Sequence, residues 1–350
     1  MPSVLHVLPH PGGGGETYID LLEGAETFSH RRVALSGSRI PVRAAVSLPA
    51  RIPSIARAAR GADLVHVHGD TAALLALPIL RGRPSVVTTH GLHLLRRITG
   101  PTRALVVAGL RAAAQVADRV ICTSQAERDE LAIMFPPSAA RRLVVVRNGI
   151  DLPPPVDPAQ RAATRAELHL EAGDVAALFL GDLHKRKAPL DAVAAARAAR
   201  ARGAPLVLLV AGDGPQATAV HDRAGPAVRP LGFRDDVPRL LGAADLLVMP
   251  SAREGLSFAV LEAMGRGLAM VVSDGPGNPE AVGDAGIIVP VGDRAALADA
   301  LTRLACDGEE RARLGAAARE RVRTTFTLER LRDGVSATYH EALGIPEQAA

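Results

Sequence analysis

Short apolar runs rich in β-branched residues recur along the chain and alternate with segments of helical character. Six runs precede residue 150 and five follow it: VLHVL, RRVALS, DLVHVH, SVVTTH, RVICTS and RLVVVRN, then VAALFLG, LVLLVAG, DLLVMPS, LAMVVSD and GIIVP. Strands separated by helices build parallel sheets, and runs so continuously apolar suit strands that helices cover on both faces. The pattern therefore predicts an α/β fold.

The chain has 350 residues, which is too long for one compact core of ordinary size. The segment 151–158 reads DLPPPVDP, and its four prolines interrupt regular structure between the two series of runs. We therefore predict two Rossmann-like domains, residues 1–152 and 153–326, with this segment as the linker between them.

Basic charge is concentrated in the first half of the chain. Residues 1–152 hold 18 Arg and no Lys against 11 acids, whereas residues 153–350 hold 23 basic residues against 26 acids. A basic domain can attract nucleic acid, an anionic membrane or an anionic substrate. The arginines are scattered and no aromatic or Lys-rich stretch accompanies them, so we expect a solvated surface and no nucleic-acid partner.

Two cysteines, Cys122 and Cys306, lie far apart without the spacing of metal ligands, which fits a reducing compartment. The chain starts on a strand-like run without a charged leader, and no stretch of about 18 apolar residues follows. We expect a cytoplasmic protein that is at most peripheral at the inner face of a membrane.

In open α/β sheets, ligands bind beyond the carboxyl ends of the strands, so the residues after each run are the candidates for a site. One such loop, GDLHKRK at 181–187, contains both lysines of the chain, Lys185 and Lys187. The two asparagines, Asn148 and Asn278, each lie beside a glycine in another loop. In a chain biased so strongly toward Arg, the retained lysines indicate a chemical need.

The most specific segment is PSAREGLSFAVLEAMGRG at 250–267, in which Glu254 and Glu262 stand eight positions apart. Glu254 follows a strand, and Glu262 falls within the next helix. A turn that leads into a helix N-terminus offers free backbone amides and a positive dipole end, which suit a diphosphate. The two carboxylates can accept hydrogen bonds from sugar or ribose hydroxyls.

In this segment the chain resembles glycosyltransferase family 4, whose retaining enzymes share the GT-B fold and an E-x7-E signature. Nearly the whole chain takes part in the resemblance. Further motifs follow in the expected order: the glycine loop 12–15, ADRVICTS at 117–124, RNGID at 147–151, AGDGP at 211–215, LGF at 231–233, AADLLVMPS at 243–251 and GNPE at 277–280. The resemblance implies two Rossmann-like domains facing an interdomain cleft, with the acceptor on the N-terminal domain and the donor on the C-terminal domain. It also implies that a last helix, about 327–350, crosses back onto the N-terminal domain.

The resemblance further implies roles for donor-binding residues. Glu254 would contact the transferred sugar, and Glu262 would contact the ribose. The amides that would hold the diphosphate belong to Gly255, Leu256, Ser257 and Phe258. The position that contacts the base is matched by Gly232, Phe233 and Arg234. Contacts there run largely through the backbone, so UDP and GDP both remain open.

One departure concerns the loop at 181–187. The family reads GRLxxxKG where this chain has GDLHKRKA, so Lys187 matches the phosphate-binding lysine while Asp182 replaces its arginine partner. An acid at that position would repel a leaving diphosphate. We expect Lys185 or Arg186 to restore the lost positive charge. The alternative is a solvated basic loop in which Asp182 pairs with a neighbour.

Gly13 and Gly14 follow the first run, in a loop that approaches the diphosphate or the acceptor in the resembling family. The alternatives are a purely structural turn and the start of a dinucleotide-binding fold, whose G-x-G-x-x-G spacing is only partly met. His90 ends the run SVVTTH and matches a position whose backbone carbonyl lies near the reacting sugar carbon. We therefore expect His90 to belong to the catalytic site.

His66 and His68 flank Val67 at the end of another run, so strand alternation puts both on one face. We expect His68, with Asp70 and His93, to line the acceptor pocket. A metal site would need at least a third ligand, and none is evident from the sequence. No metal and no cofactor other than the nucleotide sugar is therefore expected.

The motifs and the resemblance that they carry imply a retaining, metal-independent hexosyltransferase that uses a UDP- or GDP-sugar. The acceptor is expected to be a small sugar, a glycolipid or a natural-product aglycone. The resemblance implies a front-face mechanism, in which the donor phosphate helps to deprotonate the acceptor hydroxyl while the protein supplies positioning and charge stabilisation. Two alternatives are a non-catalytic nucleotide-sugar-binding subunit, weakened at Asp182, and a nucleotide-sugar epimerase, which the two glutamates disfavour.

Overall fold

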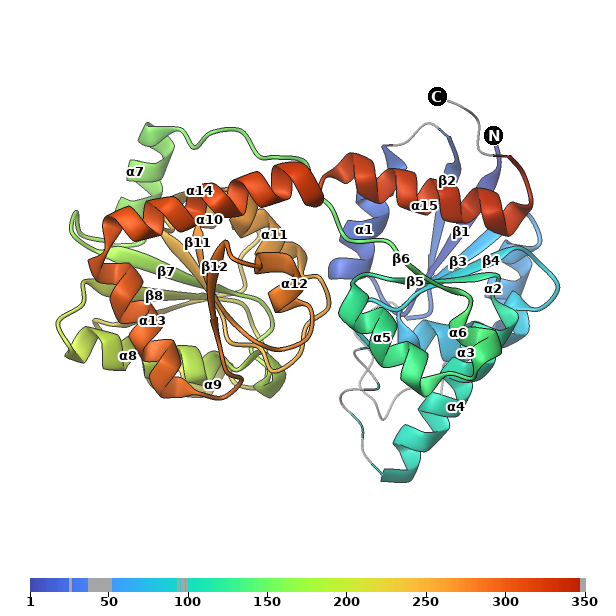
Figure 1. Ribbon diagram of the computed structural model, residues 1–350, viewed down its shortest axis with the longest axis horizontal. Coiled ribbons are helices and arrows are strands. Elements are labelled where there is room, and N and C mark those ends of the chain that lie inside the picture. Colours follow the sequence, from blue (N-terminus) through green and yellow to red (C-terminus); the bar gives the residue numbers. More distant parts are fainter. Residues whose placement is uncertain (25–26, 37–51, 93–94, 96–97, 99, 347–350) are drawn as a thin grey trace. The chain divides into compact units, whose positions relative to one another are not determined.

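The computed structural model describes residues 1–24, 27–36, 52–92, 95, 98 and 100–346, and Figure 1 draws its helices and strands. The chain divides into two compact units. Unit 1 comprises Met1–Asn148 with Leu328–Ala350, and unit 2 comprises Gly149–Thr327. Each unit contains a six-stranded sheet whose paired strands are parallel. The predicted α/β class, with two Rossmann-like parallel sheets, is confirmed.

The sheet of unit 1 has the strand order β2-β1-β3-β4-β5-β6. Its strands are β1 Ser3–Leu8, β2 Ser29–Ala34, β3 Leu64–His68, β4 Ser85–Thr88, β5 Arg119–Cys122 and β6 Leu143–Val145. Its helices are α1 Gly14–Glu23, α2 Ile52–Ala59, α3 Asp70–Leu80, α4 Gly100–Val116, α5 Gln125–Met134, α6 Pro137–Ala140 and α15 Leu328–Leu343. The strand order reverses between β1 and β3, which is where ligands bind in doubly wound sheets.

The sheet of unit 2 has the strand order β12-β11-β10-β7-β8-β9. Its strands are β7 Val175–Leu180, β8 Leu206–Ala211, β9 Val228–Gly232, β10 Leu246–Met249, β11 Ala269–Ser273 and β12 Gly286–Val289. Its helices are α7 Pro158–Glu167, α8 Pro189–Ala201, α9 Ala217–His221, α10 Val237–Ala243, α11 Phe258–Gly265, α12 Asn278–Val282, α13 Arg294–Cys306 and α14 Gly308–Thr325, with a short 3-10 turn at Lys185–Lys187. Here the order reverses between β7 and β10.

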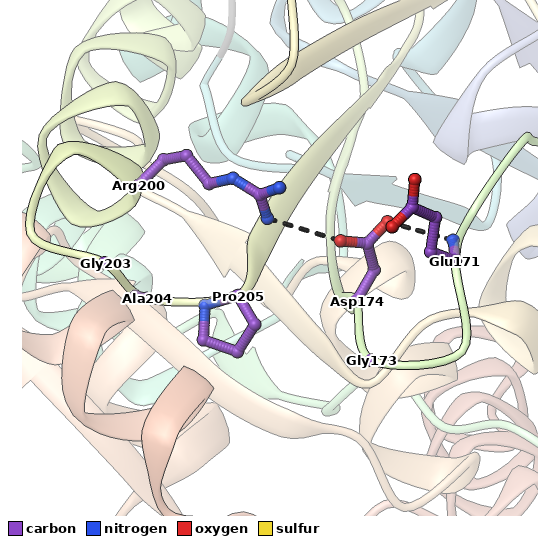
Figure 2. Close-up of a pocket in the computed structure, with 7 residues that line it drawn as sticks. All are labelled: Glu171, Gly173, Asp174, Arg200, Gly203, Ala204 and Pro205. Carbon is purple, nitrogen blue, oxygen red and sulfur yellow. Dashed lines mark hydrogen bonds and ion pairs between the residues drawn. The ribbon is translucent and has the colours of Figure 1, made fainter.

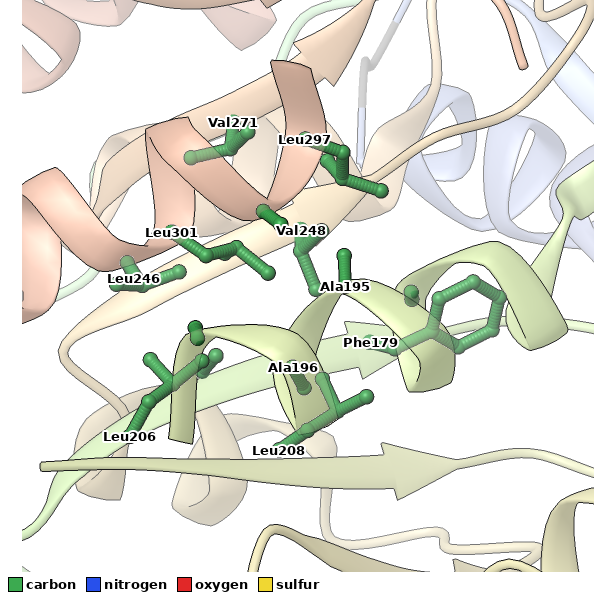
Figure 3. Packing of buried hydrophobic residues seen from close by; sticks show 14 of the residues in the cluster. Phe179, Ala195, Ala196, Leu206, Leu208, Leu246, Val248, Val271, Leu297 and Leu301 are labelled. Atoms are coloured by element: carbon green, nitrogen blue, oxygen red, sulfur yellow. The ribbon is translucent and has the colours of Figure 1, made fainter. Parts of the chain in front are cut away.

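Both faces of the unit 2 sheet are buried. Along β7, Ala177 and Phe179 join a core beneath α8 and α13, whereas Ala176 and Leu178 join a second core on the opposite face. Figure 3 shows the first core, where alanines of α8 bring the helix close to large side chains of β7 and β8. Two-sided burial explains why these strands are apolar throughout rather than alternating.

Strand β9 was not among the predicted runs. Its sequence, VRPLG, includes an arginine and Pro230, and most of it is only half-buried. A proline cannot donate to a sheet ladder and is therefore confined to edge strands. The strand lies at the edge of the sheet, beside β8, where that missing donor is tolerated.

The proline segment 151–158 belongs to unit 2, and side chains of that unit hold it in place. The carbonyl oxygen of Pro154 accepts a hydrogen bond from Arg266 at 2.8 Å, and that of Pro153 accepts one from Arg319 at 3.2 Å. The segment thus packs on unit 2, because two arginines of that unit satisfy its carbonyl groups. Within the described ranges, no helix is long and apolar enough to cross a lipid bilayer.

Candidate functional site

Two loops meet where the strand order of unit 2 reverses. The loop at 181–187 follows β7, and the loop at 251–257 follows the neighbouring strand β10. The backbone N–H of Ala252 donates to the carbonyl oxygen of Arg186 at 2.9 Å, so the loops are joined directly. This edge of the sheet is the expected ligand-binding position of the fold.

Glu254 lies at this junction as a buried carboxylate between two cations. Its side chain is 4 % exposed, and its Oε1 lies 2.9 Å from Lys187 Nζ and 3.2 Å from Arg186 Nη1. Burial by itself would raise the pKa of Glu254, but Lys187 and Arg186 bring that pKa below its ordinary value. Buried ion pairs add little net stability because desolvation opposes them. The two partly exposed cations outnumber the buried carboxylate, an arrangement that suits an anionic ligand.

Close backbone approach shapes the same junction. A Cβ added to Gly277 would lie 2.3 Å from the carbonyl oxygen of Gly255, and one added to Gly212 would lie 1.9 Å from that of Gly181. Gly277 has φ 92 and Gly212 has φ 147, values that side chains disfavour. The loops after four different strands therefore meet without side chains between them.

The helix α11 begins directly after these loops. Ser257 is its N-cap residue but makes no side-chain capping hydrogen bond, which leaves N–H groups of the first turn without a side-chain acceptor. Gly255 and Leu256 connect Glu254 to this N-terminus, and Phe258 is the first helical residue. Burial raises the pKa of Glu262, on the next turn of α11, to about 7.

The remaining predicted donor residues lie in two further places. Gly232 ends β9, and Phe233, which follows it, is 78 % exposed. Arg234 donates two hydrogen bonds to Asp236, at 2.7 and 2.6 Å. Lys185 is exposed, unlike the other two basic residues of its loop, which turn toward Glu254.

The predicted residues of unit 1 follow β1, β3 and β4. Gly13 is the N-cap of α1, with φ 80, and Gly14 is the first residue of that helix. Asp70 begins α3, where it is buried and its Oδ2 accepts from the N–H of Leu95 at 2.9 Å. His93 lies outside the described residues.

His90 has φ 50, a left-handed conformation that non-glycine residues adopt at some energetic cost. The following N–H, of Gly91, donates to Glu127 Oε1 at 2.6 Å. Glu127 is buried and also accepts from the N–H of Thr123 at 2.8 Å. Glu127 was not among the residues predicted from the sequence, although a capping-box pattern with Ser124 marks it at the start of α5. Its reach to Gly91 is tertiary.

His68 belongs to a larger histidine cluster. It is hydrogen-bonded to His90 at 2.9 Å and to His6 at 2.8 Å, and His6 is hydrogen-bonded to His30 at 2.8 Å. His66, on the same strand, contacts Tyr339 and Thr88. Strand alternation predicted that His66 and His68 share one face, but no pattern in the sequence connects them with His6 or His30.

Another hollow in unit 2, of about 400 Å³, contains none of the predicted residues. Figure 2 shows its lining: Glu171, Gly173, Asp174, Arg200, Gly203, Ala204 and Pro205. Asp174 and Pro205 directly precede β7 and β8, so this hollow lies at the amino ends of the strands. Ligands of doubly wound sheets bind at the carboxyl ends, and the loops around Glu254 remain the candidate site.

Comparison with known proteins agrees with this arrangement. Residues 6–153 match the family model described as Glycosyltransferase Family 4, and residues 174–307 match the model described as Glycosyl transferases group 1. An alpha-maltose-1-phosphate synthase of Mycolicibacterium smegmatis is 32% identical over 77% of this chain and 76% of its own length. A D-inositol 3-phosphate glycosyltransferase of Saccharomonospora viridis is 32% identical over 80% of this chain and 70% of its own.

A solved structure shows the same fold at lower identity. HepE of Anabaena, crystallised in complex with UDP-glucose, superposes with a TM-score of 0.82 at 19% identity, covering 97% of this chain and 99% of that one. The fold comparison and the two matched family models point the same way as the motifs. The chain belongs to glycosyltransferase family 4 and is a glycosyltransferase.

Proposed function

We propose that this glycosyltransferase is a retaining enzyme that moves a hexosyl group from a UDP- or GDP-sugar to a hydroxyl of a small acceptor. The acceptor would be a sugar, a glycolipid headgroup or a natural-product aglycone. The observation that carries the proposal is the ion cluster of Glu254 with Lys187 and Arg186 at the reversal point of unit 2. Its two cations match the charge of a nucleotide diphosphate.

In this proposal the donor contacts both the positive groups and the carboxylates at the junction. Lys187, Arg186 and the N-terminal amides of α11 would face the diphosphate, while Glu254 would accept hydrogen bonds from the sugar. Glu262 would contact the ribose, and the loop 232–234 would contact the base. Asn278 supports a ligand near these loops. Its buried side-chain oxygen has no hydrogen-bond partner among the described residues, and a donor-sugar hydroxyl would supply one.

The reaction would break the bond from the anomeric carbon to the diphosphate and form one from that carbon to the acceptor oxygen on the same face. The acceptor proton would pass to a diphosphate oxygen. The protein's part is then to hold the two substrates in place and to stabilise the leaving charge. We propose that neither a metal nor a further cofactor takes part in the transfer.

Unit 1 would bind the acceptor through His68, Asp70 and His93, with His90, Gly13 and Gly14 facing the reacting groups. The name of the inositol-phosphate relative supports a small polyol acceptor, and the UDP-glucose complex of HepE supports a UDP-sugar donor. We also propose a cytoplasmic location with peripheral contact to an anionic membrane. Residues 1–152 contain 18 Arg but only 11 acids, and this positive balance supports that contact.

The test is a screen of UDP- and GDP-sugars against small acceptors, read by mass spectrometry, with Glu254→Ala beside the wild type. Hydrogen bonds that tighten in the transition state are worth roughly 1.5 to 3 kcal/mol each, so the variant should lose about 10- to 150-fold in turnover. Nucleotide binding should survive. Glu171→Ala, in the hollow at the amino ends of the strands, is the matched control and should behave as the wild type.

Two outcomes would contradict the proposal. Near-normal turnover of Glu254→Ala with its proper donor would mean that the site is elsewhere. A wild type that binds UDP or GDP but forms no product with any donor would favour the non-catalytic binding subunit instead.

A further inference from the structure

The histidine cluster of unit 1 lies in a core that would ordinarily be apolar. On β1 and β3, Leu5 and Val67 are among the residues that join the apolar core on one face of the sheet. Strand alternation puts His6, His66 and His68 on the opposite face, and all three are at most 1 % exposed. His6 and His66 are register partners on the neighbouring strands.

One ring nitrogen of each of these three histidines lies within 4.8 Å of those of the other two. The shortest pair joins His6 Nδ1 to His68 Nε2 at 2.8 Å. Two tetrahedral ligands of a zinc ion with bonds of about 2.1 Å lie about 3.4 Å apart. An ion that replaces the shared proton would thus require the pair to open by only about 0.6 Å, with His66 drawn in from the side.

The other ring nitrogens are already held. His6 Nε2 is bonded to His30 at 2.8 Å, and His68 Nδ1 is bonded to His90 at 2.9 Å. His66 has an oxygen partner on each side, Tyr339 at 2.6 Å and Thr88 at 2.7 Å, so either nitrogen can bind while the other keeps its partner. Outer partners of this kind orient metal-binding histidines and select their tautomer.

One further observation agrees with a ligand at this place. The hydroxyl of Tyr18, on α1, is buried and faces Thr88 without a hydrogen bond of normal geometry. A buried hydroxyl without a partner is destabilising, and a ligand of the ion could supply that partner.

We propose that His6, His66 and His68 form a binding site for one late first-row divalent metal ion of the zinc class, buried between the sheet and helices α1 and α15. Imidazole ligands favour such ions over magnesium or calcium. The ion would tie β1 to β3. If His66 binds it through Nε2, the bond from Nδ1 to Tyr339 would extend this link to α15. This site is separate from the sugar-nucleotide chemistry of unit 2, but it shares His68 with the acceptor site proposed for unit 1. The inference does not rest on the proposed function, because its test measures metal binding and not sugar transfer.

The test uses the full chain, unfolded in chelator and refolded with Zn²⁺ or Co²⁺. We expect one equivalent of zinc by elemental analysis after dialysis and, with Co²⁺, the visible absorption bands of a nitrogen-ligated tetrahedral site. His6→Gln should abolish both. The same substitution at the exposed His221, in unit 2, is the matched control and should keep both.

A second variant protects the test against simple misfolding. His30→Gln removes only an outer partner of His6, and loss of such partners typically weakens metal binding by about 10- to 100-fold. The variant should therefore still bind Zn²⁺, with lower affinity in a competition titration.

Two results would overturn the proposal. A wild-type chain without stoichiometric zinc and without the Co²⁺ bands would make the cluster a neutral hydrogen-bonded network. Zinc that stays bound at unchanged affinity in His6→Gln would place the ion elsewhere.

Discussion

Arg186 and Lys187 are adjacent in sequence, and both direct a cation at one carboxylate oxygen of Glu254. Lys185, one position earlier, is exposed. The sequence left open which of Lys185 and Arg186 restores the charge that is lost at Asp182. Lys185 and Arg186 lie on the short 3-10 turn Lys185–Lys187, where consecutive side chains point in different directions. The geometry favours Arg186.

We therefore expect Arg186→Ala and Lys187→Ala each to weaken donor affinity and lower turnover, by about 10-fold or more for a lost charged hydrogen bond. Lys185→Ala is the matched control in the same loop and should change neither value substantially. Asp182→Arg should be tolerated or should tighten donor binding. Donor titration with initial rates measures all four variants. If Lys185→Ala is impaired and Arg186→Ala is normal, Lys185 and not Arg186 restores the charge that is lost at Asp182. If only Lys187→Ala is impaired, one lysine and the backbone amides stabilise the leaving diphosphate without help from either residue.

At the scale of elements, the helix α11 joins the two glutamates of the most specific sequence segment. Glu254 precedes its N-terminus, and Glu262 lies one turn into it. The two carboxylates have opposite pKa shifts, because Glu254 has two cationic neighbours while burial acts alone on Glu262. Equal residue types thus acquire different charge behaviour from their surroundings.

The raised pKa of Glu262 predicts a pH-dependent stability. Its folded pKa of about 7 lies above the ordinary value of 4.5, so the folded state holds this proton more tightly than the unfolded state. The resulting stabilisation is present below the ordinary pKa and disappears as pH rises toward 7. Glu262→Gln, which cannot ionise, should therefore gain stability relative to the wild type between pH 5 and pH 8. Urea unfolding midpoints at both values measure this, with a difference on the order of 3 kcal/mol at most. A constant difference between the two proteins would contradict the shifted pKa.

In unit 1, helix α5 carries the buried Glu127, whose carboxylate accepts hydrogen bonds from the loops after β4 and β5. Glu127→Ala would leave the N–H groups of Gly91 and Thr123 without their acceptor, which should lower the free energy of unfolding by about 2 to 4 kcal/mol. Asp129→Ala, an exposed position on the same helix, should change it by less than about 0.5 kcal/mol. Urea unfolding compares them. Equal small effects would mean that water readily replaces Glu127.

At the scale of the whole molecule, the proposed reaction has a stereochemical consequence. The product should keep the anomeric configuration of the donor. Freshly added EDTA should not slow the transfer, because in the proposed site Lys187, Arg186 and backbone amides would stabilise the leaving diphosphate. NMR of the product and rate measurements in EDTA check the two statements. An inverted product would contradict the first. Activity that is lost in EDTA and restored by magnesium or manganese would contradict the second, whereas restoration only by zinc would point to the histidine site.

The sequence by itself determined the fold class, the family and most of the strands, because these depend on local properties. Parallel strands that are buried on both faces are mostly apolar, and the loops after them carry the polar residues that a ligand requires. Strand β9 was not predicted because it lacks a continuous apolar run: as an edge strand it tolerates Pro230 and partial exposure. Its existence depends on pairing with β8, and no local pattern specifies which strands pair.

Only the tertiary structure decided which polar residues meet. Glu254 lies 67 positions from Lys187 along the chain and 2.9 Å from it in space, because β7 and β10 are neighbours in the sheet. The pairing of β1 with β3 brings together His6, His66 and His68. Likewise, Glu127 on α5 accepts a hydrogen bond from Gly91 in the loop after β4. Such contacts follow from strand order and burial, which are global properties of the packed chain. Spacing along the sequence marked the candidate residues, and packing selected their partners and their charge states.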